Sequence, residues 1–189
     1  MEFGTETNHV FTFYYGQDHL LFKASDFLKK GLKENEKCFY CFKDRKGDEL
    51  LNRLKQKDLK TKQLLYLDIE KIVTLYLKQG KKALKNELVK LVKQAKKEGY
   101  KRVRILNSPL TAKEILTDEK LIVWERVLDE ILMKIDGILI LCPYNVRSLI
   151  NEKKNKSEIK FIKDALKVHT SLLSAEEIYQ INDEFNITI

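Results

Sequence analysis

The stretch "FYYGQDHLLFKASDFLKKGLKENEKCFYCF", residues 13–42, decides the fold class. It starts at the end of an apolar strand and passes through a short loop into a segment with apolar residues at helical spacing. After a turn it enters "EKCFYCF" (36–42), a nearly continuous apolar run that is typical of a strand buried on both faces. This strand–loop–helix–strand layout is that of a nucleotide-binding α/β unit.

The loop of this unit lacks the residues that bind phosphate. A phosphate-binding loop presents backbone N–H groups from several glycines, together with a lysine and a Ser or Thr hydroxyl. The segment "YYGQDHLL" (14–21) has one glycine and neither of the other two groups at that spacing. The later strand "GILILCPY" (137–144) ends in Cys-Pro-Tyr rather than in a magnesium-binding acid. We therefore expect no ATP hydrolysis, while weak nucleotide binding stays open.

The alternation of strands and helices continues along the chain. The expected strands are 9–15, 36–42, 63–68, 101–108 and 137–145. The expected helices include 82–98, 117–132, 158–166 and 175–184, and Gly80 and Gly99 are expected to end helices. This pattern predicts an α/β fold with a mostly parallel β-sheet and helices on both faces, a three-layer sandwich. The length predicts a single domain over residues 1–189.

The composition indicates a charged, folded protein, with 43% hydrophobic residues, 34% charged residues and a net charge of +8. No apolar run approaches the roughly 20 residues that span a membrane. The N-terminus does not have the pattern of a secretory signal, so we expect a cytoplasmic protein. Lysines alternate with glutamates on expected helix surfaces, which fits a thermophilic source. The lysine-rich segment 78–102 predicts a solvated face, and nucleic acid is the less favoured partner.

The cysteines indicate buried thiols. Cys38, Cys41 and Cys142 are an odd number and lie in apolar, strand-like sequence. Disulfides are not expected in a reducing compartment, and free cysteine is among the most buried residue types. Cys38 and Cys41 are three residues apart on one strand and so point to opposite faces.

The histidines leave two kinds of chemistry open. His9, His19 and His169 could form a metal site with Cys142, because His and Cys are zinc ligands. Nothing in their spacing demands such a site, so we predict neither a metal nor a cofactor. Alternatively, Cys142 could act as a nucleophile with His169 as its base.

The strand ends carry a candidate ligand site. Ligands of parallel sheets bind at the carboxyl ends of the strands. Those ends carry polar and aromatic residues, among them Tyr14, Asp68, Asn107, Ser108, Pro143, Tyr144 and Asn145. Such a rim suits a small molecule.

The order of several short motifs resembles the MEDS domain, the methanogen and methylotroph sensory domain found in the dichloromethane-responsive regulator. The matching residues are His9 and Tyr14; Phe27, Gly31, Leu32 and Glu36; Tyr76, Leu77 and Gly80; Gly99, Tyr100 and Arg104; Trp124 and Glu125; Leu141, Cys142 and Tyr144; and His169. The resemblance covers residues 9–173. It implies a relative of the RecA/KaiC ATPase core, a degenerate P-loop fold that has lost the phosphate-binding loop.

The resemblance also implies a function. It implies a sensory domain that binds a small ligand such as a hydrocarbon derivative and signals through a partner, for example a histidine kinase or a transcription regulator. It implies no enzyme activity. The ligand-facing residues that it implies are His9, Tyr14, Arg104, Glu125, Cys142, Tyr144 and His169. Where the family often has acids, this chain has Asn107 and Asn145, which removes negative charge from the expected rim.

Several alternatives remain open at this stage. Arg104 and Glu125 could form a structural ion pair between a strand and a helix. His9 begins its strand and could lie at the opposite edge of the sheet from the rim. The chain could also be an enzyme that uses Cys142 or a His/Cys metal site, or a basic nucleic-acid-binding protein. The sequence identifies neither the ligand nor the partner, and it leaves a homodimer open.

Overall fold

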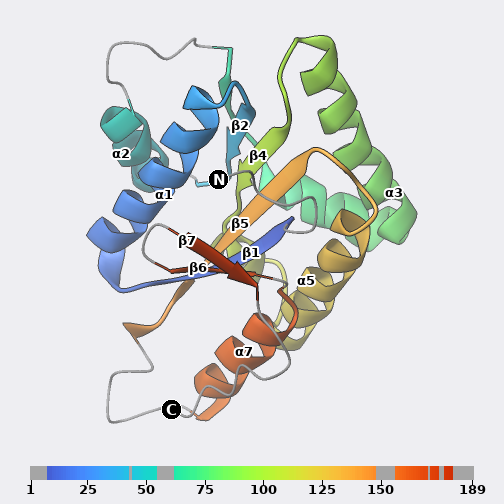
Figure 1. The fold of residues 1–189 in the computed structure, drawn as a ribbon. Coiled ribbons are helices and arrows are strands. Elements are labelled where there is room, and N and C mark those ends of the chain that lie inside the picture. Colours follow the sequence, from blue (N-terminus) through green and yellow to red (C-terminus); the bar gives the residue numbers. More distant parts are fainter. Residues whose placement is uncertain are drawn as a thin grey trace.

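The computed structural model describes residues 8–42, 44–54, 62–147, 156–169, 171–174 and 177–180. Strands and helices alternate through most of this range, as Figure 1 shows. The elements are β1 (His9–Tyr14), α1 (Gly16–Lys33), β2 (Lys37–Tyr40), α2 (Asp44–Leu54), β3 (Leu64–Tyr66), α3 (Ile69–Lys97), β4 (Val103–Leu106), α4 (Pro109–Lys113), α5 (Asp118–Leu132), β5 (Ile138–Asn145), α7 (Lys156–Lys167), β6 (Ser171–Ser174) and β7 (Glu177–Gln180).

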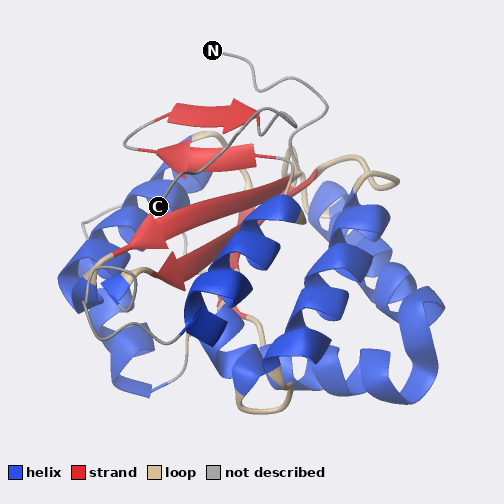
Figure 2. Cartoon of the chain, turned by 90° about the horizontal axis from the view of Figure 1, so that it is seen from below, coloured by secondary structure: helices blue, strands red, loops and turns tan. Residues whose placement is uncertain are grey.

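The described strands form a seven-stranded sheet in the order β3-β2-β4-β5-β1-β6-β7. All neighbours from β3 to β6 pair in parallel, and β7 at the edge pairs with β6 in the antiparallel sense. Helices cover both faces of this sheet (Figure 2). The predicted α/β fold with a mostly parallel sheet in a three-layer sandwich is therefore confirmed.

Two separate cores lie on the two faces of the sheet. On one face, which we call the α5 face, β1 contributes Phe11, and α3, α5 and α7 pack over the strands. On the other, the α1 face, β1 contributes Val10 and Tyr14, and α1 and α2 cover them (Figure 1). The division follows from strand geometry, because successive side chains point to opposite faces. Cys38 lies on the α1 face and Cys41 on the α5 face, and both are buried and free, as predicted.

Glycines shape the long helix α3 as the sequence predicted. The Asp68 side chain caps its start by accepting a hydrogen bond from the Lys71 N–H (3.3 Å). Gly80 kinks it with φ 76° and ψ −174°, a backbone conformation that is essentially restricted to glycine. Gly99 follows the helix with φ 86°.

The helix predicted for residues 175–184 is wrong where the structure describes the chain. Glu177–Gln180 form β7, which pairs with β6 (Ser171–Ser174). The Glu-rich start of this segment favoured a helix locally, but a hairpin partner supplies its backbone with hydrogen bonds that sequence periodicity does not reveal. Residues 181–184 lie outside the described residues. Within the described part of the chain, every helix is too short or too polar to cross a membrane.

Candidate functional site

Four buried side chains with metal-binding or acid–base chemistry meet inside the α5 face. His9, Glu125, Cys142 and His169, which we call the buried tetrad, are each at most 3% exposed. One nitrogen, oxygen or sulfur atom from each lies within 4.8 Å of those of the others. The fold thus brings together residues that are up to 160 positions apart in the sequence. Four of the seven predicted ligand-facing residues meet in this cluster.

Strand register and helix periodicity explain why the four side chains of the tetrad lie close together. In the parallel pair β1 and β5, His9 lies opposite Ile140 and Phe11 lies opposite Cys142. His9 and Cys142 both point to the α5 face, where the buried stripe of α5 presents Glu125 between Leu121 and Leu128. His169 follows the end of α7 and stacks on His9, with ring centroids 3.9 Å apart at 29°.

The carboxylate of Glu125 lies at the centre of the tetrad. Its Oε2 atom is 3.1 Å from His9 Nε2, 3.6 Å from Cys142 Sγ and 3.6 Å from His169 Nε2. The other ring nitrogen of His9, Nδ1, lies 3.2 Å from Asp129 Oδ1. Burial by itself lowers the pKa of His9, but hydrogen bonds with Asp129, Cys142 and Glu125 outweigh it and raise the pKa well above its usual value.

The pKa of His169 is shifted in the opposite direction from that of His9. Its Nδ1 lies 2.7 Å from the Ala165 carbonyl oxygen, which can only accept, so Nδ1 carries the proton and donates it. Burial and the neighbouring His9 lower the pKa of His169 well below its usual value. The ring is therefore neutral, and its Nε2 lone pair faces Glu125 with no hydrogen-bond donor among the described residues.

Cys142 is held by an amide and an imidazole. The Asn107 side chain donates a hydrogen bond from Nδ2 to Sγ (3.3 Å), and His9 Nε2 lies 3.6 Å from Sγ. Burial, followed by the charge of Glu125, raises the pKa of Cys142 to about 11. A thiol with that pKa is almost entirely protonated at neutral pH.

A pocket lies beside the tetrad at the carboxyl ends of β4 and β5. Its volume is about 210 Å³. It is lined by Pro109, Leu110, Lys113, Pro143, Tyr144, Asn145, Phe161 and Ile162. The position is the one expected for a ligand site in a parallel sheet.

Tyr144 forms the wall that the pocket and the tetrad share. Its ring stacks on Phe11 with centroids 4.6 Å apart at 3°, and it meets His169 edge-on at 5.8 Å. Burial and the charge of Glu125 raise the pKa of Tyr144 well above its usual value. The predicted rim residues Pro143, Tyr144 and Asn145 therefore do line a cavity, whereas His9 lies at the start of its strand, inside the sheet rather than on the rim.

Tyr14 and Arg104 lie apart from this site, on the α1 face. Tyr14 borders a hollow of only about 10 Å³, which is room for about one water molecule. Arg104 donates to Glu36, to Glu34 (3.1 Å) and to the Phe27 carbonyl oxygen (3.0 Å). The Arg104–Glu125 ion pair that the sequence left open does not form, because Arg104 points to the α1 face while Glu125 packs on the α5 face.

Sequence reasoning missed several residues around the tetrad and the pocket. Asp129 lies one helical turn after Glu125, and this i, i+4 spacing was a usable signal. Asn107 was expected on the rim, but its contact with Cys142 was missed. It follows β4 with the same parity as Ile105, so it points to the α5 face. Lys113 and Phe161 enter the pocket from α4 and α7, and nothing local in the sequence indicates this.

His19 lies outside the tetrad. It is exposed and accepts a hydrogen bond from the Tyr15 N–H (3.1 Å).

The fold and the site define a mostly parallel α/β domain with a pocket at its strand ends and a cluster of buried polar side chains behind it. The family described as MEDS, MEthanogen/methylotroph, DcmR Sensory domain, matches residues 8–170, which is most of the chain. The chain belongs to the MEDS family, as its motifs indicated, and MEDS is a sensory domain. No curated protein matches the chain.

Proposed function

We propose that this sensory domain binds a small, mainly apolar molecule, such as a hydrocarbon derivative, in the pocket above Tyr144. The observation that carries the proposal is the 210 Å³ cavity at the carboxyl ends of β4 and β5. Most of its lining is apolar, contributed by Pro109, Leu110, Pro143, Phe161 and Ile162. A small cavity with an apolar lining and few polar groups favours a compact ligand with one polar end.

The polar groups of the pocket narrow the ligand further. Lys113 Nζ is 2.8 Å from Asp118 Oδ1 and 4.2 Å from the centroid of the Phe161 ring. Its charge is thus already balanced by a carboxylate and an aromatic face. Binding a neutral alcohol, amide or haloalkane in this pocket should cost less free energy than binding an anion, because an anion would have to compete with Asp118 for Lys113.

The pocket wall suggests how binding is signalled. Tyr144 is 4% exposed and packs against Phe11 and Phe161. A ligand that moves its ring also moves the packing of β1 and α7, because close-packed interiors transmit small displacements. In this proposal α4 and α7 change their surfaces on binding, and a signalling partner such as a histidine kinase or a transcription regulator reads the change.

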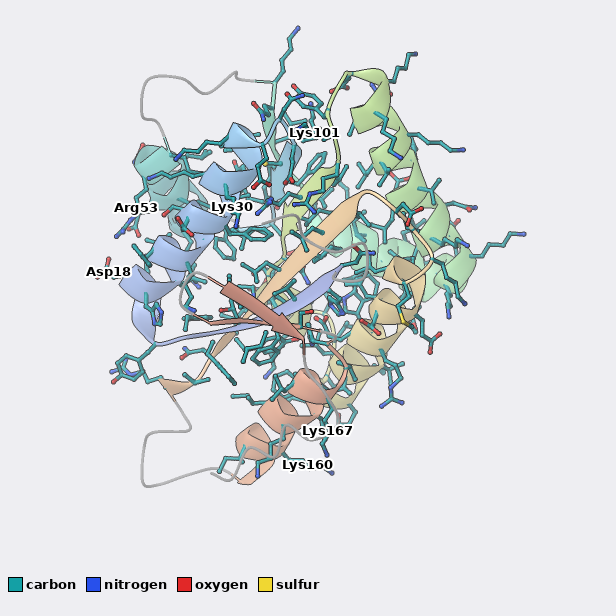
Figure 3. All side chains as sticks on the ribbon, in the orientation of Figure 1. Asp18, Lys30, Arg53, Lys101, Lys160 and Lys167 are labelled. Carbon is teal, nitrogen blue, oxygen red and sulfur yellow. The ribbon has the colours of Figure 1, made fainter. Side chains whose placement is uncertain are left out.

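The proposal does not include catalysis. Cys142 is 0% exposed, and burial raises its pKa to about 11, which argues against a thiolate nucleophile. The imidazole in contact with its sulfur is that of His9, and His169 donates from Nδ1 to a backbone carbonyl instead. Figure 3 shows Lys30 on α1, Lys101 after α3, and Lys160 and Lys167 on α7. This spread over distant parts of the chain favours a solvated surface over a nucleic-acid groove.

The test is a thermal-shift and calorimetric screen with short alcohols, amides and haloalkanes. A compound that binds only the folded chain raises its melting temperature with concentration. Leu110 is 41% exposed and lines the pocket, so Leu110→Trp should fill the cavity and weaken binding by at least about tenfold.

Val123→Trp is the matched control, because Val123 is exposed on α5 and does not line the pocket. It should bind like the wild type. The proposal fails if no compound of the panel shifts the wild-type protein, or if Leu110→Trp responds as the wild type does.

A further inference from the structure

We propose that the buried tetrad His9, Glu125, Cys142 and His169 is a closed binding site for a divalent metal ion of the zinc class. The donor set is one thiol, two imidazoles and one carboxylate, all of which are protein ligands of Zn²⁺. The proposal is independent of the pocket, because none of the four residues lines it.

The spacing of the donor atoms suits a tetrahedral ion. Bonds of about 2.0–2.3 Å at tetrahedral angles separate ligand atoms by about 3.3–3.6 Å. Four of the six distances between the donor atoms are 3.1 Å (His9 Nε2 to Glu125 Oε2) and 3.6 Å (Cys142 Sγ to His9 Nε2, Cys142 Sγ to Glu125 Oε2, and His169 Nε2 to Glu125 Oε2). The other two, from His169 Nε2 to His9 Nε2 and to Cys142 Sγ, are within 4.8 Å. The imidazole rings of His9 and His169, stacked at 29° in this structure, would have to rotate out of their stack, since a metal lies near the plane of a ligating ring.

Two atoms point to a ligand independently of the spacing. Glu125 Oε1 and His169 Nε2 are buried and have no hydrogen-bond partner among the described residues. Leaving such groups unpaired in a dry interior costs about 1–3 kcal/mol each. Both atoms carry lone pairs, so each needs a hydrogen-bond donor or a cation. A cation bound by His169 Nε2 would satisfy that nitrogen, and it would lie beside Oε2 of the same Glu125 carboxylate.

A second shell of hydrogen bonds already orients the ligands. The Nδ1 atoms of His9 and His169 face Asp129 Oδ1 (3.2 Å) and the Ala165 carbonyl oxygen (2.7 Å). This leaves each Nε2 as the ligating atom, the arrangement that metal-binding histidines commonly have. Asn107 donates to the sulfur of Cys142 (3.3 Å), as expected around a thiolate ligand.

The charge of the tetrad also matches a divalent ion. A Cys142 thiolate and the Glu125 carboxylate supply two negative charges, and the two imidazoles are neutral ligands. A Zn²⁺ ion would make the first shell neutral, which suits a site whose residues are at most 3% exposed. Four protein ligands leave no open position, so the site would be structural or regulatory rather than catalytic.

The test loads the full chain with Co²⁺ and with Zn²⁺ after treatment with a chelator. We expect one ion per chain, the visible bands of tetrahedral Co²⁺ and a thiolate-to-cobalt charge-transfer band. Cys142→Ser should lose the charge-transfer band. Cys41→Ser is the matched control, a buried cysteine of the same face outside the tetrad, and it should keep the band.

Two further measurements do not depend on the folding of Cys142→Ser. X-ray absorption of the zinc-loaded wild-type chain should show one sulfur neighbour at about 2.3 Å and three nitrogen or oxygen neighbours at about 2.0–2.1 Å. Asp129→Asn should weaken zinc binding by about 10–100-fold. A folded wild-type chain that binds no stoichiometric ion, or binds one without a sulfur neighbour, overturns the proposal.

Discussion

At the scale of single residues, Gly31 shows how a buried ion pair constrains the main chain. A Cβ atom at Gly31 would lie 2.6 Å from Arg104 Cδ, 2.6 Å from Arg104 Nε and 2.9 Å from Cys38 Sγ. Arg104 cannot give way easily, because Glu36, Glu34 and the Phe27 carbonyl oxygen hold its guanidinium. The glycine that the family motif carries is thus explained by close packing of α1 on β4.

Gly31→Ala should therefore lower the free energy of unfolding by about 1–3 kcal/mol. Helix propensity alone predicts the opposite, a gain of about 1 kcal/mol from replacing glycine inside a helix. Urea unfolding followed by circular dichroism decides between them. Asp26→Ala, at an exposed position of the same helix, is the control and should change stability by less than about 0.5 kcal/mol. A stabilised Gly31→Ala variant would show that Arg104 moves freely.

At the scale of elements, a cluster of ions joins the end of α1 to β2 and β4. Glu36, next to β2, accepts hydrogen bonds from Arg102 and Arg104, and it is 2% exposed. Burial would raise the pKa of Glu36, but the hydrogen bonds and charges of Arg104 and then Arg102 outweigh it and lower the pKa. Because the folded-state pKa lies below the unfolded value, the stabilisation is present above the unfolded pKa and is lost as the pH falls through the folded one.

Glu36→Gln should cost about 3 kcal/mol at pH 7, since it leaves Arg104 buried without its closest countercharge. The difference from the wild type should shrink as the pH is lowered below about 4. Urea unfolding over a pH series measures both effects, with the exposed Glu114→Gln as the control. If the stability difference between Glu36→Gln and the wild type stays constant from neutral to acid pH, the Glu36 carboxylate does not stabilise the fold through its charge.

The strands and helices of the core could be predicted from the sequence, whereas the edge of the sheet could not. Apolar runs and their turn residues indicate elements such as β5 and α5, because burial on both faces leaves a local signal. Whether Glu177–Gln180 is a strand depends on its pairing with β6, which is a non-local property. The parity of strand positions was applied to Cys38 and Cys41 but not to the residues of β1. His9 and Tyr14 differ by five residues on β1, which already places them on opposite faces.

At the scale of the whole molecule, the pocket and the buried tetrad form one layer of the α5 face, with Tyr144 between them. The motifs named the tetrad residues one by one, but their convergence depends on how β1, β5, α5 and the chain after α7 pack, which no local pattern encodes. The same holds for the pocket, since α4 and α7 complete it from distant parts of the chain. The sensory assignment rests on the family match, whereas the pocket and the tetrad are properties of the tertiary structure.

The most direct test of this account is to map ligand binding by amide chemical shifts of the ¹⁵N-labelled chain. Titration with the strongest compound of the alcohol, amide and haloalkane panel should shift amides near the pocket, at residues 110–113, 144–145 and 161–162, and then those of His9 and His169 behind Tyr144. The α1 face around Arg104 should change little. Saturable shifts confined to the α1 face, or no localised shifts with any compound, would contradict a sensor with its pocket at the ends of β4 and β5.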